Sequence, residues 1–474
     1  MNQSMLMDFY ELTMANGYYH TPLKDAVCYF DLFYRTNPND GGYAIFCGLE
    51  SIVEYINQLH FTKEDVEFLR SKNTFSEEFL DYLLNFKFTG DIYGFKEGSI
   101  IFPNEPIITV KATTLEAQLI ETYLLLIVNH QSLIATTAKR IVVSAQGKPV
   151  LEFGSRRAHG ASSAVLGARA AYIAGCVGTA CTVTDQLYGV PAIGTMAHSW
   201  VQMFDSEIEA FTEYCKRYPN NATLLVDTYD VLNSGIPNAI KAFDTVLKPL
   251  GITKCGIRID SGDITYLSRK ARKMLDAAGW TECKICISNS LDEHIIMDVL
   301  NQGAKIDTFG VGEKLITSKA DPVFGGVYKL VAVEKNGEIV PKIKKSENII
   351  KITNPGYKKV YRIYEEGKMI ADLIALHDEV YDGKEPLTIF DEQQTWKKRT
   401  FTDYLIEEQH VVIFKDGKQV YELPSTEEVK EYCNKQYSLL WDEVTRFTNP
   451  HKYYVDLSEK LYNLKYKMLE DIKN

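Results

Sequence analysis

At 474 residues and 45% hydrophobic content, the chain is too long for one ordinary domain and can fill sizeable cores. A formal net charge of −11 argues against a broad nucleic-acid-binding surface, so anionic ligands would need local positive charge. No apolar run of about 18 residues and no signal-peptide pattern is present, so we expect a cytoplasmic protein without a membrane partner.

The first 125 residues predict an α+β segment. Tyrosine-rich runs surround a helical pattern near 48–59, and residues 88–110 carry strand and turn signals.

The central segment, residues 126–333, alternates short β-rich runs with helical patterns. The expected strands are 150–153, 192–193, 224–226, 256–259, 284–287, 306–309 and 326–333. Helical spacing is present in 240–250, in the segment after Ser261, which can cap it, and in 291–300. Such alternation predicts a parallel sheet, and seven units favour an irregular TIM-like (β/α) barrel that carries catalysis.

Residues 334–474 predict a second α+β segment, with strands in 351–364 and 369–375. We expect this segment to pack with the N-terminal segment in one discontinuous domain beside the barrel.

The nine cysteines lie mostly in apolar runs and are expected to be reduced core thiols. Cys283 and Cys286 form a C-x2-C pair inside an expected buried strand. No second pair has matching spacing, so we expect no zinc site.

The run from Glu152 to Gly160 (EFGSRRAHG) follows an expected strand and opens an expected helix. Adjacent Arg156 and Arg157, together with backbone amides, predict an anion site, because guanidinium groups bind phosphate or carboxylate in a bidentate manner. A solvated arginine pair on a loop is the alternative.

Two further motifs follow expected strands. His198, in GTMAHSWVQMF, precedes an apolar helical run and suits a base, a ligand or a phosphoryl acceptor. A hydrogen-bonded structural histidine is an equal alternative. Asp227 closes the strand at 224–226, where a solvated turn is the other interpretation.

The motif IRIDSGD places Arg258 and Asp260 on the same face of a strand, with Asp263 near the following helix start. Asp263 could reach a bound divalent cation through water. A structural Arg–Asp pair with a capping aspartate is the alternative.

The motif FGVGEKLITSK places Gly310 and Gly312 where backbone amides can face a phosphate, and Lys314 and Lys319 add positive charge. These strand-end motifs together predict a small substrate with several phosphates or carboxylates, bound with Mg2+. No G-x-G-x-x-G follows a strand and no GxxxxGK[ST] occurs, so ATP would be held in another way. The residues alone leave the reaction open, and a phosphate-binding lyase or isomerase remains an alternative.

In combination, these motifs resemble the nicotinate phosphoribosyltransferase family. The resemblance extends to the run Asp8–Met14 near the start and to Thr353–Arg362 near the end, and it therefore covers nearly the whole chain. It implies transfer of a phosphoribosyl group from phosphoribosyl pyrophosphate to nicotinate, the first step of NAD salvage from nicotinate. It further implies coupling to ATP hydrolysis through a phosphohistidine at His198, with Mg2+ and without a prosthetic group.

The resemblance also implies the roles of individual residues. Arg156 and Arg258 would contact phosphates, and Gly310 with Gly312 would cradle the 5′-phosphate. Asp260 would lie near ribose and the metal-bound pyrophosphate, so that Asp260 and Asp263 would bind Mg2+ through water or pyrophosphate. Phe153 would stack on the pyridine ring, and Tyr10 of a second subunit would cover the other face of that ring. Ser155 or Arg157 would hold the nicotinate carboxylate, and Thr179 and Asp227 are further expected substrate contacts. Lys314 and Lys319 are expected ATP contacts. A homodimer with sites at its interface follows.

Ala180 separates this family from nicotinamide phosphoribosyltransferase. The nicotinamide enzymes carry an aspartate after Gly-Thr, whereas Gly178-Thr179 is followed here by Ala180. A carboxylate there would repel nicotinate, so Ala180 favours the acid substrate. Quinolinate phosphoribosyltransferase is shorter and lacks the histidine motif, and a catalytically silent scaffold would have no need of the intact site residues.

Overall fold

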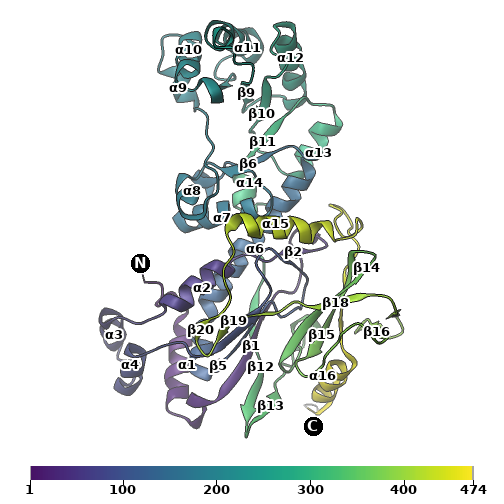
Figure 1. Ribbon diagram of the computed structural model, residues 1–474. Coiled ribbons are helices and arrows are strands. Elements are labelled where there is room, and N and C mark those ends of the chain that lie inside the picture. The colour runs from purple at the N-terminus through teal and green to yellow at the C-terminus, as the bar shows by residue number, and fades with distance from the viewer. Residues whose placement is uncertain (1, 472–474) are drawn as a thin grey trace. The chain divides into compact units, whose positions relative to one another are not determined.

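The computed structural model describes residues 2–471 and divides into two compact units (Figure 1). The terminal unit contains Met1–Leu133 and Val323–Asn474, and the central unit contains Ile134–Pro322. The sequence placed the corresponding boundaries at residues 125/126 and 333/334.

The central unit is built on a six-stranded parallel sheet in the order β7-β6-β11-β10-β9-β8. Its strands are β6 (Val150–Glu152), β7 (Gly178–Thr179), β8 (Thr223–Leu225), β9 (Gly256–Ile259), β10 (Lys284–Ile287) and β11 (Thr308–Val311). Apolar side chains such as Leu224, Ile257, Ile285 and Phe309 are fully buried. These are the near-continuous apolar runs expected of strands covered on both faces.

Helices connect these strands, which confirms the predicted α/β fold with a parallel sheet (Figure 1). They are α7 (Ala161–Ile173), α8 (Thr182–Tyr188), α9 (His198–Gln202), α10 (Glu207–Arg217), α11 (Ile236–Ala242), α12 (Ile264–Ala277), α13 (Glu293–Asn301) and α14 (Glu313–Ile316). The cap of α12 is Asp263 rather than Ser261, because the Asp263 carboxylate accepts from the Tyr266 amide at 2.8 Å.

Closure of the sheet into a barrel is not observed. Ala192 makes a single parallel bridge to Thr179, and within residues 2–471 no ladder joins it to β8. The run expected at 326–333 does form a strand, β12 (Val327–Lys335), but it pairs antiparallel with β1 (Val27–Phe33) in the terminal unit.

The terminal unit contains two larger sheets. One has the order β13-β12-β1-β5-β3-β19-β20, and the other has the order β18-β14-β15-β21. Their remaining strands are β3 (Asp91–Gly94), β5 (Ile108–Thr113), β13 (Glu338–Pro341), β14 (Lys358–Glu365), β15 (Lys368–Leu376), β18 (Leu405–Glu408), β19 (Val411–Lys415), β20 (Lys418–Gln419) and β21 (Tyr454–Leu457). β14 and β15 confirm the two strands predicted in this region.

Small sheets and helices complete this unit. The pairs are β2 (Ala44–Ile45) with β4 (Ile100–Ile101), and β16 (Leu387–Phe390) with β17 (Lys398–Phe401). The helices are α1 (Phe9–Tyr19), α2 (Leu49–Gln58), α3 (Lys63–Arg70), α4 (Glu77–Leu84), α5 (Thr114–Gln118), α15 (Thr426–Ser438) and α16 (Glu459–Asp471), while α6 (Glu121–Ser144) continues into the central unit.

All nine cysteines are buried and lie outside disulfide bonds, which agrees with the predicted reduced core thiols. Among the described residues, no group of three or more His, Cys, Asp or Glu side chains is arranged to hold a metal ion. No helix in the described part of the chain is long and apolar enough to cross a membrane.

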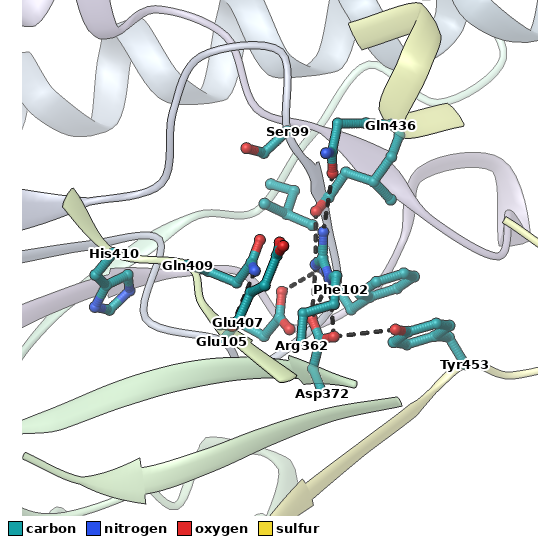
Figure 2. A network of polar contacts seen from close by, with 12 residues as sticks. Ser99, Phe102, Glu105, Arg362, Asp372, Glu407, Gln409, His410, Gln436 and Tyr453 are labelled. Atoms are coloured by element: carbon teal, nitrogen blue, oxygen red, sulfur yellow. Dashed lines mark hydrogen bonds and ion pairs between the residues drawn. The ribbon is translucent and has the colours of Figure 1, made fainter. Parts of the chain in front are cut away.

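A fully buried ion pair joins β14 and β15 in the terminal unit (Figure 2). Arg362 donates to both carboxylate oxygens of Asp372, from Nε at 2.9 Å and from a terminal nitrogen at 2.6 Å. It also donates to the Ile100 carbonyl at 2.9 Å, and the Tyr453 hydroxyl donates to Asp372 at 3.0 Å. The pair therefore has enough hydrogen bonds to offset much of the cost of desolvating two charges.

Replacing one residue of the Arg362–Asp372 pair should leave the desolvation cost of the other charge without compensation. We expect Arg362→Met to lower the free energy of unfolding by about 3–5 kcal/mol, because Asp372 is left buried without its counter-charge. The matched control is Arg399→Met, which removes a 46% exposed arginine paired with Glu365 and should cost no more than about 1 kcal/mol. Midpoints of denaturant unfolding measure both, and equal midpoints for the two variants would contradict this account.

Candidate active site

The carboxyl ends of the parallel strands place most predicted motifs along one edge of the sheet. Phe153 follows β6, Asp260 follows β9 and Gly312 follows β11, while Asp227 lies two residues beyond β8. Residues far apart in sequence are therefore neighbours at this edge.

The buried carboxylate of Glu152 organises the β6 end of the site. One oxygen accepts from the Thr179 hydroxyl at 2.6 Å, and the other accepts from the Gly154 amide. Burial raises the pKa of Glu152, and these two hydrogen bonds act against that shift. Thr179 is itself fully buried, so the contact in which the structure places this predicted substrate residue is with Glu152.

The predicted arginine pair lies in a short 3-10 turn, Ser155–Arg157, just beyond this carboxylate. Both Arg156 and Arg157 are exposed, and the turn leads to α7 after Gly160. A positive φ of 135° at Gly160 explains the glycine at that position. The guanidinium groups are thus accessible to an anion.

His198 is the first residue of α9 and its side chain is 40% exposed. Its Nδ1 lies 3.1 Å from the Thr228 hydroxyl, and its Nε2 lies 4.0 Å from a carboxylate oxygen of Asp260. The second distance is too long for a hydrogen bond. Nδ1 is therefore held by Thr228, whereas Nε2 lies near the Asp260 carboxylate without a hydrogen bond to it.

Asp260 is fixed by groups from two neighbouring strand ends. The Ser288 hydroxyl donates to its carboxylate at 2.5 Å, and its backbone amide donates to Asp227 at 3.0 Å. Asp227 also accepts from the Ser261 hydroxyl at 2.6 Å. The loops after β8, β9 and β10 are therefore joined by one set of polar contacts.

Three predicted site residues carry buried polar atoms without a hydrogen-bond partner. These atoms are the Ser155 hydroxyl oxygen, one carboxylate oxygen of Asp227 and the Arg258 Nε. Arg258 is otherwise held by a 2.6 Å hydrogen bond to the Thr195 hydroxyl. Buried polar atoms in native proteins are nearly always paired, so these three atoms fit contacts to a polar ligand.

The structure gives other partners to the remaining predicted residues of the central unit. Asp263 caps α12, Lys314 forms a 2.5 Å ion pair with Asp292, and Lys319 pairs with Glu313 at 2.9 Å. Each of these three side chains therefore already has a partner within the protein, and none needs a bound ligand to be paired.

Tyr10 lies in the terminal unit, on α1, and is 43% exposed. Partial burial and the nearby Glu121 raise its pKa above the usual tyrosine value.

Sequence reasoning missed the roles of Thr228, Ser288, Thr195 and Glu152. Glu152 and Thr195 lie inside recognised motifs, Thr228 follows Asp227, and Ser288 follows an expected strand, but their partners come from other strands. Only the order of strands in the sheet reveals these contacts.

Models of nicotinate phosphoribosyltransferase domains match most of the chain. The N-terminal domain matches residues 5–129, the family model residues 149–377 and the C-terminal domain residues 357–465. The nicotinate phosphoribosyltransferase of Bacillus subtilis is 43% identical over 475 residues, which cover 99% of this chain and 96% of that protein. The Dictyostelium discoideum protein of the same name is 34% identical and covers 97% and 87%, respectively.

Solved structures agree with this relationship. The crystal structure of human nicotinic acid phosphoribosyltransferase has a TM-score of 0.86 at 28% identity and covers 98% of this chain and 100% of its own. Nicotinate-nucleotide pyrophosphorylase from Pyrococcus furiosus has a TM-score of 0.71 at 22% identity and covers 92% and 95%, which shows a shared fold. The chain belongs to the nicotinate phosphoribosyltransferase family.

Proposed function

We propose that the protein transfers a phosphoribosyl group from phosphoribosyl pyrophosphate to nicotinate, forming nicotinate mononucleotide and pyrophosphate in the cytoplasm. The observation that carries the proposal is the set of unpaired buried polar atoms at Ser155, Asp227 and Arg258, on the edge where family motifs converge. A small molecule with both anionic groups and hydroxyl groups would satisfy them, because an anion accepts from Arg258 whereas Asp227 needs a donor or a cation.

The transfer passes through a ribosyl centre with oxocarbenium character. As the bond to pyrophosphate breaks, Arg258 and Arg156 offset the negative charge that develops on the leaving group. Asp260, held by Ser288, faces the ribose. The parallel sheet would close into an irregular barrel between Ala192 and β8 and so surround this edge.

Carboxylate oxygens are the ligands that Mg2+ prefers, and Asp260 with the unpaired oxygen of Asp227 offers them. The described residues contain no larger ligand group, so phosphate oxygens of the substrate would complete the coordination. When bound there, Mg2+ would neutralise pyrophosphate charge.

Nicotinate would stack on Phe153, with its carboxylate held by Ser155 or Arg157. Phe153 is half-buried, so one part of the ring remains available to a flat ligand. Tyr10 of a second copy would cover the other face, which makes the functional unit a homodimer.

ATP hydrolysis would be coupled to the transfer through His198. A ring nitrogen attacks the terminal phosphorus of ATP, the bond to the ADP oxygen breaks, and water later cleaves the P–N bond to release phosphate. Phosphorylation next to Asp260 would alter the affinity of the pyrophosphate region and so link ATP hydrolysis to the transfer equilibrium.

The purified protein with phosphoribosyl pyrophosphate and Mg2+ should convert nicotinate, and not nicotinamide, to its mononucleotide. ATP should raise that rate. Chromatographic quantification of both products, with and without ATP, measures this. Turnover of nicotinamide but not nicotinate would show that the protein is instead a nicotinamide phosphoribosyltransferase. Turnover of neither substrate would refute the proposal.

His198→Ala should abolish ATP stimulation while a basal transfer rate remains. The rates with and without ATP should agree within about twofold, because no nitrogen is left to accept the phosphoryl group. His294→Ala, at a 64% exposed position on α13, is the control and should keep full stimulation. Undiminished stimulation in His198→Ala would remove this residue from the mechanism.

Ala180→Asp should raise KM for nicotinate about tenfold or more, because two like charges near a protein surface repel by about 1–4 kcal/mol at 4 Å. Ala180 is exposed after β7, so the longer side chain fits without a clash. Ala180→Asn matches its size without the charge and should change KM much less. Steady-state kinetics with varied nicotinate compare the two, and equal KM values would exclude an electrostatic role for this position.

A further inference from the structure

Gly310 lies in the middle of β11 and is fully buried against Phe153. A Cβ atom at position 310 would lie 2.5 Å from Cδ2 and 2.7 Å from Cε2 of the Phe153 ring. It would also lie 3.1 Å from the Ser288 Cβ. Non-bonded carbon atoms pack at about 3.5–4.0 Å, so the Phe153 ring occupies the space that any side chain at this position needs.

The backbone gives no separate reason for a glycine at position 310. Its φ is outside the left-handed region, and it pairs in regular parallel register with Leu151 of β6. An alanine would adopt this strand conformation without strain. The requirement for glycine therefore comes from the neighbouring ring.

The backbone of Phe153 cannot shift to make room. Its amide donates to the Val311 carbonyl at 2.8 Å, which extends the pairing of β6 with β11. On either side, the Glu152 carbonyl accepts from the Ala180 amide at 2.8 Å and the Gly154 amide donates to the Glu152 carboxylate. With the backbone fixed, rotation of the ring is the remaining response to a side chain at position 310.

We infer that Gly310 is a positioning residue that sets the orientation of the Phe153 ring, and thereby the position at which the aromatic substrate stacks. The inference rests on the proposed function, because Phe153 is the ring on which nicotinate stacks. Gly310 was expected from the sequence to cradle the 5′-phosphate, and its buried place in the strand gives it this different role.

The two roles for Gly310 differ in the substrate they affect. Loss of the ring position changes binding of nicotinate, whereas loss of a phosphate cradle changes binding of phosphoribosyl pyrophosphate. A displacement of about 1 Å at a reacting group can lower the rate about a hundredfold. We therefore expect the main effect of a methyl group at position 310 on the nicotinate side.

Gly310→Ala should raise KM for nicotinate at least tenfold and change KM for phosphoribosyl pyrophosphate less than threefold. In a Phe153→Val background, which lacks Cδ2 and Cε2, the same substitution should have less than a threefold further effect on KM for nicotinate. Gly17→Ala is the control, because a Cβ there meets nothing within 4 Å, and it should leave both constants unchanged. Steady-state kinetics of the wild type, the single variants and the double variant measure this.

An unchanged KM for nicotinate in Gly310→Ala would overturn the inference, as would an equal effect with and without the Phe153 ring. A larger rise in KM for phosphoribosyl pyrophosphate than for nicotinate would instead assign Gly310 to binding of the 5′-phosphate.

Thermal melting tests the same contact without activity. Gly310→Ala should melt at a lower temperature than the wild type, and adding Phe153→Val should recover part of that loss. Absence of recovery would overturn the inference. Failure of the wild type to use nicotinate would refute the proposed function, while the melting result would still report on the Gly310–Phe153 contact.

Discussion

The carboxylate of Glu152 is the contact on which the geometry of the site depends. Glu152 has no exposed surface and pairs with Val311 of β11 on one side and Thr179 of β7 on the other. A buried carboxylate without partners would be costly, and here the Thr179 hydroxyl and the Gly154 amide provide donors to both oxygens. The same hydrogen bonds that offset the cost of burying this carboxylate also fix the backbone at Phe153. One set of contacts therefore both stabilises Glu152 and orders the site.

From this fixed point the site extends across the sheet through short side chains. Ser288 orients Asp260, Asp227 binds the Asp260 amide, and Thr228 holds one nitrogen of His198. Each contact joins the end of one strand to a loop after another, so none of these side chains has its position set by local sequence alone. Side chains held in this way need little reorganisation when a ligand binds, which is the condition for effective electrostatic stabilisation.

The sequence predicted the parts of the fold that are encoded locally. β9 and β10 were predicted to the residue, because each is a short run rich in isoleucine that ends at a polar residue, Asp260 or Ser288. β12 was predicted as a strand, but its antiparallel partner β1 lies about 300 residues away and the pairing leaves no local pattern. Likewise, the charge of Lys314 was visible in the sequence, whereas its ion pair with Asp292 depends on how α13 and α14 meet.

The two glycines of the β11 motif show how one pattern can have two physical causes. Gly310 is buried in the strand, where a Cβ would overlap the Phe153 ring. Gly312 is half-exposed just past the strand, where it begins α14 with φ −112° and ψ −98°. A glycine pair after a strand predicts a phosphate loop because free backbone amides bind anions, but only Gly312 has left the sheet. This edge of the sheet therefore combines a glycine that makes room for an aromatic ring with one that exposes the backbone, and the strand boundary at Val311 separates the two.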